Sequence, residues 1–439
     1  MEADWPMIVV LALATALTVY IGRLWFKRWF NPLSTYSALW GFCLGTYELK
    51  LIQYYPVSTS AWLYILAAWM SLYFGALTAL IILGHSRIPA RCTDEKSVKL
   101  IRQAIIALSV IGALAVARQM QILTREFGGV ITAVLASGNE IYLGKLTGEL
   151  AFFPYIGSVL YAGCALSGVY TARIGKLTLV SSVPIVLIAF NNALSMIRAG
   201  VIMAAFLFLA GFLLTPGARQ LTIKRWQATL GAGVAVSVLL GGFFLVSSTR
   251  GLAVDFPGIT PAMDQISSYV PFFPSVYSNV SATPVALSLY LSAPVEDKNG
   301  VWGQYTFAPL LRVLAKTGLV RERERYEEEY YTPVPTNTST YLKDLDSDFG
   351  FVGILGFPYF LGMAMTLLIL GLERVPKLTY VILLSNLYLL ILSSFAVNLM
   401  VLGDWYMSTF VGVVVGAIID RRTVFLSPPK AWQRKLGVS

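Results

Sequence analysis

Apolar runs of about 20 residues recur along nearly the whole chain, separated mostly by short polar segments. A helix needs roughly 20 mostly apolar residues to cross the hydrocarbon core of a bilayer. The runs lie at 6–24, 34–54, 58–84, 99–118, 151–171, 176–196, 199–215, 228–248, 349–372, 377–396 and 398–418. This pattern predicts an all-α polytopic membrane protein with about 11 transmembrane helices. Residues 398–404 form either a tight turn between the last two runs or a re-entrant element.

Basic residues mark one side of the predicted membrane domain, because they cluster in alternate short connections. They are Arg23, Lys27, Arg28, Arg87, Arg91, Lys96, Lys99, Arg173, Lys176, Arg219, Lys224, Arg225, Arg374 and Lys377. Lysine and arginine accumulate in cytoplasmic loops. We therefore expect these connections and the basic C-terminal tail in the cytoplasm, and the N-terminus on the opposite, outer side of the membrane. Glu2 and Asp4 precede the first run, where a secretory signal would be basic, so we expect that run to remain as a membrane helix.

Two longer outer segments divide the predicted chain. The expected parts are 1–248, with eight helices and a small outer loop at 118–150, then a large, partly helical outer loop at 249–348, and finally 349–439, with three helices and the tail. Helical spacing predicts an interfacial helix in the small loop, broken at Gly128–Gly129, and an amphipathic helix at 307–316. The mixed-charge run at 321–331 is typical of a solvated helix. A loop of roughly a hundred residues is usually functional.

Composition supports the membrane class. Hydrophobic residues make up 56% of the chain and charged residues 13%, with a mean hydropathy of +0.68, whereas soluble proteins carry about 25% charged residues. The net charge of +10 follows from the cytoplasmic loops and does not indicate nucleic-acid binding. Three separated cysteines and one histidine, His85, provide neither a disulfide framework nor the spacing of a metal site.

Two arginines are expected at the outer membrane boundary, where positive charge is otherwise sparse. Arg198 lies between two apolar runs, and Arg250 ends the eighth run, just before Gly251. Guanidinium groups stay charged and bind phosphate oxygens through two parallel hydrogen bonds. The pair therefore predicts a site for a lipid-linked diphosphate, which Arg118 and Arg125 would extend. The alternative is that these arginines only reach lipid phosphates.

The segment 332–353 concentrates polar side chains just before an apolar run. Its aspartates, Asp344, Asp346 and Asp348, suggest a metal site, but in a helix only Asp344 and Asp348 share a face, and we predict no bound metal. We expect Asp348 to begin the membrane helix that follows, where the helix dipole favours negative charge. Either Asp348 or Asp346 would act as base on a sugar hydroxyl. Predicted substrate-binding residues are Asn337, Thr338, Tyr341 and Lys343.

These residues carry a resemblance to a known family. The segments NTSTYL (337–342) and DFGFVG (348–353), which follow the largest outer loop and open an apolar helix, resemble the oligosaccharide repeat-unit polymerases, the O-antigen polymerases of the Wzy class. The early FNPL (30–33) after the first helix, and Arg198 before an apolar run, are similar to that family too.

The resemblance implies an inner-membrane glycosyltransferase of lipopolysaccharide or related polysaccharide biosynthesis. Such enzymes join oligosaccharides carried on undecaprenyl diphosphate, as both donor and acceptor, at the periplasmic face. The resemblance therefore implies that the outer side, with the N-terminus and the loops at 118–150 and 249–348, is the periplasm. Such enzymes use no nucleotide sugar, obligatory metal or other cofactor, and they work alongside a flippase and a chain-length regulator. The family's external arginines correspond to Arg198 and Arg250, and more loosely to Arg118.

Two alternatives remain. A secondary transporter or flippase would place ionisable groups near the bilayer midplane, whereas the interiors of these runs are nearly free of charge, with Asn191 and Asn192 the main polar exceptions. The related O-antigen ligase is expected to carry a histidine in its large outer loop, and residues 249–348 contain none. The polymerase is therefore the favoured interpretation.

Overall fold

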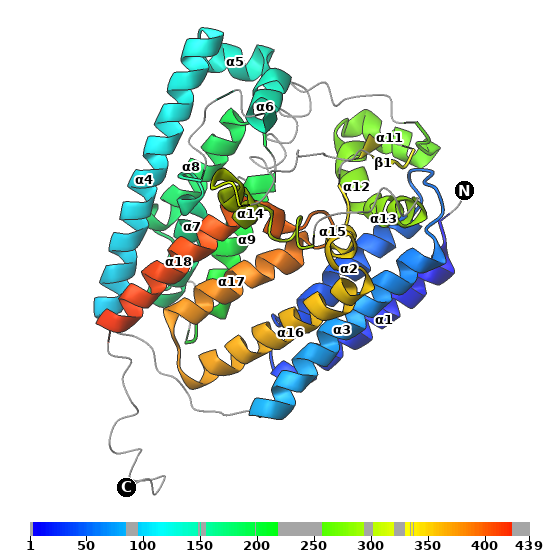
Figure 1. Ribbon diagram of the computed structural model, residues 1–439, viewed down its shortest axis with the longest axis horizontal. Helices are drawn as coiled ribbons and strands as arrows, with labels where there is room; N and C mark the ends of the chain where they lie inside the picture. Colours follow the sequence, from blue (N-terminus) through cyan, green and yellow to red (C-terminus); the bar gives the residue numbers. More distant parts are fainter. Residues whose placement is uncertain are drawn as a thin grey trace, which may run out of the picture. The chain divides into compact units, whose positions relative to one another are not determined.

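The computed structural model describes residues 3–84, 95–147, 150, 155–197, 199–217, 257–293, 302–319, 330–333, 335–336 and 338–423. The chain divides into two compact units, each described here by itself. Unit 1 comprises Met1–Leu83, Arg250–Thr366 and Leu387–Tyr406, and unit 2 comprises Gly84–Thr249, Leu367–Asn386 and Met407–Ser439. Described residues of the large outer segment therefore pack with the first three helices of the chain (Figure 1).

Helices dominate both units. Unit 1 contains α1 (Trp5–Phe26), α2 (Pro32–Glu48), α3 (Thr59–Leu83), α11 (Pro261–Tyr269), α12 (Phe273–Ser281), α13 (Thr283–Ser292), α14 (Ala308–Lys316), α15 (Tyr341–Phe349) and the 3-10 helix η2 (Leu399–Val401). Its short strands β1 (Tyr330–Tyr331) and β2 (Pro335–Thr336) pair antiparallel. Unit 2 contains α4 (Glu95–Phe127), α5 (Val130–Ala136), α6 (Gly138–Thr147), α7 (Val159–Ile174), α8 (Leu179–Leu194) and α9 (Ala199–Leu214). The helices α16 (Phe351–Arg374), α17 (Leu378–Ser393) and α18 (Gly403–Arg422) contribute residues to both units.

The described helices confirm an all-helical membrane architecture in its general form. Four of them, α1, α3, α4 and α16, are long and apolar enough to cross a membrane. Other apolar helices, such as α8, α9 and α17, are shorter, and the expected run at 228–248 lies outside the described residues. The number of about 11 spans, the orientation of the termini and the domain division stay predictions.

The position at which α2 starts is explained by the local sequence. Asn31 is fully buried, its side chain accepts a 2.9 Å hydrogen bond from the backbone N–H of Ser34, and Pro32 follows as the first helical residue. This arrangement satisfies a free N–H group at the helix start. The preceding Phe30 stacks on Tyr388 with ring centroids 4.3 Å apart. In the FNPL segment, then, Asn31 and Pro32 start α2, and Phe30 packs against α17.

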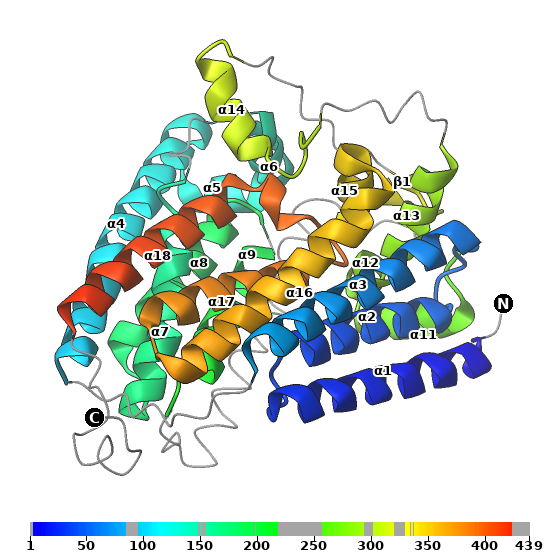
Figure 2. The ribbon, with the colours of Figure 1, turned by 60° about the horizontal axis from the view of Figure 1, so that its bottom comes forward.

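In unit 1, α3 and α16 lie side by side (Figure 2) because small residues let their backbones approach closely. A Cβ atom added at Gly75 would stand 1.9 Å from the carbonyl oxygen of Tyr359, and one at Gly362 would stand 2.2 Å from that of Leu72. The hydroxyl of Ser71 also donates to the carbonyl oxygen of Leu355. This contact positions α15, which directly precedes α16.

In unit 2, glycines also allow two helices to approach closely. Gly168 of α7 and Gly211 of α9 each face the backbone of the other helix. Around the far end of α4, Leu123, Ala133 and Ile141 form a buried cluster that joins α4, α5 and α6. The small outer loop therefore begins as a continuation of α4, which ends at Phe127, and Gly128, with a φ of 74°, breaks the helix. We expected the fourth helix to end near 118, and it extends nine residues further.

Candidate functional site

The polar segment before α16 forms a helix of its own. We expected Asp348 to begin the membrane helix, and this is wrong: α15 contains all three aspartates and ends at Phe349, Gly350 follows with a φ of 62°, and α16 begins at Phe351. The left-handed conformation of Gly350 separates the two helices without strain. Asp344 alone lies in the first turn of α15.

Asp346 is held by two phenols from different elements of unit 1. Its Oδ1 accepts a 3.0 Å hydrogen bond from Tyr64 of α3, and its Oδ2 accepts a 3.1 Å hydrogen bond from Tyr290 of α13. The hydroxyls of Tyr290 and Ser347 lie 2.8 Å apart. The bonds from the two phenols fix the direction of the Asp346 carboxylate. Because Asp346 is only partly buried and a carboxylate offers about four lone-pair positions, it can still accept a hydrogen bond from a further ligand.

Tyr290 is suited to donate to this carboxylate. Burial raises the pKa of its phenol, the hydrogen bond with Ser347 lowers it in part, and the nearby charge of Asp346 raises it further. The phenol therefore stays protonated at neutral pH and serves as a neutral donor.

Asp348 has a different environment. It is buried, and its carboxylate accepts the backbone N–H groups of Tyr305 at 2.8 Å and Thr306 at 2.6 Å. Burial raises the pKa of Asp348, while the donors of Thr306, Tyr305 and Gln304 lower it in part. Both oxygens are engaged by the segment that leads into α14, so Asp348 anchors that segment.

Asp346 and Asp348 therefore have separate surroundings. Asp346 faces tyrosines and Asp348 faces backbone N–H groups. Among the described residues, no three His, Cys, Asp or Glu side chains gather as a metal ion would require.

The predicted substrate-binding residues of this segment have structural contacts. Tyr341 is buried and its hydroxyl lies 3.1 Å from that of Tyr36, so it lies in the interior instead of facing a sugar cleft. Lys343 is buried with its ammonium 5.0 Å from the ring centre of Tyr330 in β1, an attractive cation–π distance. The hydroxyl of Thr338 lies 2.7 Å from that of Thr336 in β2.

The arginine cluster is only partly described. Arg118 and Arg125 belong to unit 2, and both are exposed. The guanidinium of Arg118 donates to the side-chain oxygen of Gln121 at 2.7 Å, and that of Arg125 lies 3.7 Å from a carboxylate oxygen of Glu126. The predicted residues Arg198, Arg250 and Asn337 lie outside the described residues.

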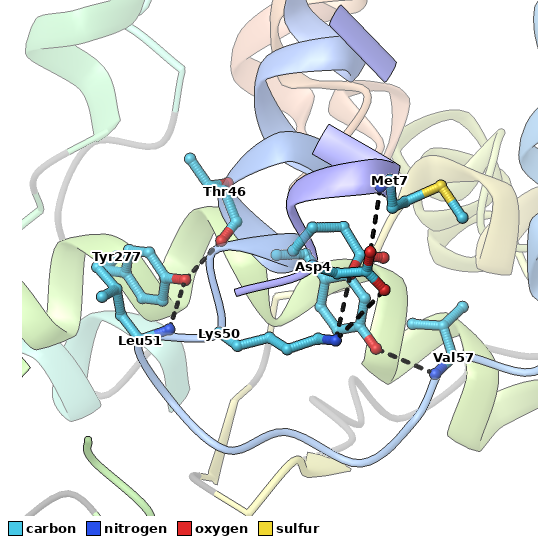
Figure 3. Close-up of polar contacts among 9 residues, drawn as sticks. Asp4, Met7, Thr46, Lys50, Leu51, Val57 and Tyr277 are labelled. Carbon is cyan, nitrogen blue, oxygen red and sulfur yellow. Dashed lines mark hydrogen bonds and ion pairs between the residues drawn. The ribbon is translucent and has the colours of Figure 1, made fainter. Parts of the chain in front are cut away.

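A second polar cluster attaches the outer segment to the connection between α2 and α3 (Figure 3). The hydroxyl of Tyr277 donates to the carbonyl oxygen of Thr46 and accepts the N–H of Leu51 at 3.2 Å. Lys50 lies 3.7 Å from the carboxylate of Asp4. Beneath these contacts, buried residues from both segments pack together, including Tyr47, Ile52, Tyr54, Met263 and Val285.

Sequence reasoning did not identify Tyr64 and Tyr290 as partners of Asp346. Tyr64 lies inside an apolar run predicted to cross the membrane, where a tyrosine is unremarkable as part of an interfacial aromatic belt. Tyr290 lies in an apolar stretch of the outer segment, and no spacing links either tyrosine to 346. The partners of Asp348 are backbone groups, which carry no residue signature. Comparison with known proteins gives no match to any family model, curated protein or solved structure.

Proposed function

We propose that this protein is a membrane glycosyltransferase that polymerises undecaprenyl-diphosphate-linked oligosaccharide repeat units at the periplasmic face of the bacterial inner membrane. The observation that carries the proposal is the carboxylate of Asp346, partly exposed and oriented by Tyr64 and Tyr290. The resemblance of 337–353 to the O-antigen polymerases supplies the reaction class.

In this reaction, a hydroxyl of the acceptor sugar attacks the anomeric carbon of the donor. A new glycosidic bond forms, the bond from sugar to diphosphate breaks, and the acceptor proton passes to a base. A positioned carboxylate contributes typically about 100- to 10,000-fold to such a step. Asp346 is the favoured base, because its carboxylate is partly exposed and can accept a further hydrogen bond from a sugar hydroxyl, whereas Asp348 is buried against Tyr305 and Thr306.

The leaving diphosphate gains negative charge as the bond breaks. Fixed cations aimed at that charge stabilise the transition state, and loss of one such donor costs about 3 kcal/mol. Arg198 and Arg250 have this role in the proposal, and Arg118 and Arg125 assist at the membrane surface. Thr338 and Asn337 are proposed to contact the sugar, while Lys343 and Tyr341 support the segment that holds them.

The test uses the full-length protein purified into liposomes with its lipid-linked repeat unit as the only sugar source. A ladder of lengthened lipid-linked products, formed equally well with a chelator present, is the expected result. Transbilayer movement of the repeat unit without any ladder would favour a flippase. In a parallel reaction to which a lipid A core acceptor is added, transfer of the sugar to that acceptor, and not to a second repeat unit, would favour the ligase.

A further inference from the structure

The helix α14 has two opposite faces. Ala308, Leu311, Arg312 and Ala315, at helical spacing, are partly buried within unit 1. The opposite side carries Leu310, Val313 and Leu314, all exposed. An apolar stripe that faces away from the protein interior requires another partner.

Two apolar residues that flank the helix in the sequence are also exposed. Trp302 is 76% exposed and Leu319 is 75% exposed. Exposed apolar side chains along one side of a helix are typical of an interaction site.

Contacts within unit 1 locate the start of α14 relative to a membrane helix. The ring centre of Phe349 lies 4.9 Å from that of Trp302 and 6.4 Å from that of Phe307. Phe349 stands two residues before Phe351, where α16 begins, and α16 is long and apolar enough to cross a membrane. The hydroxyl of Tyr406, near the start of α18, donates to the carbonyl oxygen of Thr306 at 3.0 Å. The segment therefore begins beside the end of a helix that is long and apolar enough to cross a membrane, the level at which interfacial helices lie.

The composition of the exposed side indicates what covers it. Leu310, Val313 and Leu314 are all apolar, while Arg312 lies on the partly buried side, and residues 302–319 contain no aspartate or glutamate. Amphipathic helices with leucine and other large apolar residues on one side bind the boundary between headgroups and acyl chains.

We propose that α14 is an interfacial helix that inserts Leu310, Val313 and Leu314 into the bilayer at the level of the headgroup boundary. The same segment donates the backbone N–H groups of Tyr305 and Thr306 to Asp348. Membrane docking of α14 therefore also holds Asp348 and the end of α15 in place. This role does not depend on which reaction the protein catalyses.

The experiment measures how deep position 313 lies in lipid. The full-length protein carries Val313→Cys in a Cys92→Ser background, because Cys43 and Cys164 are buried and inaccessible to label. Val313 is 64% exposed, so its replacement leaves packing intact. The cysteine receives an environment-sensitive fluorophore, and the protein enters nanodiscs of phosphatidylcholine and phosphatidylglycerol with a headgroup spin-labelled lipid as quencher. Gln265→Cys, at an exposed polar position of α11, is the matched control.

The lipid quencher should reduce the signal from position 313 several-fold more than the signal from position 265, and aqueous iodide should show the reverse preference. Leu310→Glu with Leu314→Glu should abolish the lipid quenching at 313. Quenching by iodide equal to that at 265 would overturn the proposal. Protection from both quenchers, which indicates cover by protein, would also overturn it.

Discussion

The phenol of Tyr64 donates a 3.0 Å hydrogen bond to Oδ1 of Asp346, which joins α3 to α15 within unit 1. Tyr290 binds the other oxygen of the same carboxylate. Asp346 is thereby oriented from two sides, at the point in the chain that directly precedes α16. The functional proposal depends on this orientation.

Replacing Tyr64 by Phe should lower the rate of sugar transfer about tenfold, because a hydrogen bond to a charged group contributes about 1.5 kcal/mol or more. Tyr290→Phe should have a similar effect, since it removes the donor on the other oxygen. The measurement is the initial rate of ladder formation at saturating substrate. Tyr20→Phe, at an exposed position of α1, is the control and should leave the rate unchanged. Wild-type rates in both Tyr64→Phe and Tyr290→Phe would show that the orientation of Asp346 is irrelevant.

The buried carboxylate of Asp348 predicts a pH dependence of stability. Burial raises the pKa of Asp348 in the folded protein. The folded state then binds the proton more tightly than the unfolded state, so this group contributes stability below its unfolded pKa that is lost as pH rises through its folded pKa. Compared with Asp348→Asn, the wild type should gain thermal stability as the pH falls from neutrality towards the ordinary carboxyl range near about 4. Asp264→Asn, an exposed position of α11, should match the wild-type profile. Parallel profiles for wild type and Asp348→Asn would contradict this prediction.

The close approach of α3 and α16 gives a matched pair of glycine substitutions. Gly75→Ala places a methyl group 1.9 Å from the carbonyl oxygen of Tyr359, so the helices must separate. Gly356→Ala in α16 meets no atom within 4 Å. Alanine otherwise favours a helix over glycine by about 1 kcal/mol. Thermal unfolding in detergent should therefore show strong destabilisation by Gly75→Ala and none by Gly356→Ala; similar midpoints for the two variants would argue against the packing of α3 on α16.

The attachment of the outer segment depends on Tyr277. Tyr277→Phe leaves the carbonyl oxygen of Thr46 and the N–H of Leu51 without this hydroxyl, which should destabilise the attachment by about 1 to 3 kcal/mol. Limited proteolysis within 257–293 should become faster. Tyr269→Phe, at a tyrosine that is 82% exposed, provides the comparison and should leave the cleavage rate unchanged. Equal cleavage rates in the two variants would contradict a role of the Tyr277 hydroxyl in this attachment.

The hydrophobic pattern predicts much of the helical structure, because membrane helices need apolar residues throughout their length. The runs at 6–24 and 58–84 correspond closely to α1 and α3. The pattern fails where a polar segment continues a helix, as in α4 beyond Arg118, because its turns pack on α5 and α6 instead of lipid. It also fails at Gly350. The expected membrane helix began at Asp348 and ran on without a break, whereas this one glycine ends α15 and separates it from α16.

The site is less predictable than the fold. The concentration of polar residues in 332–353 identifies Asp346 and Asp348, but their environments depend on partners far away in the chain. Asp346 contacts Tyr64, 282 residues earlier, and only tertiary structure brings them together. The burial of Tyr341 against Tyr36 has the same origin.

The most direct test of the proposed function compares two carboxylates of the same short helix in the polymerisation assay. Asp346→Asn should lower the rate of the first elongation step at least about 100-fold, because the amide cannot take the acceptor proton. Asp344→Asn, two residues earlier in α15, should keep the rate near that of the wild type. Binding of the lipid-linked repeat unit, measured separately, should be retained in both variants. Elongation by Asp346→Asn at the wild-type rate would contradict the assignment of Asp346 as the base.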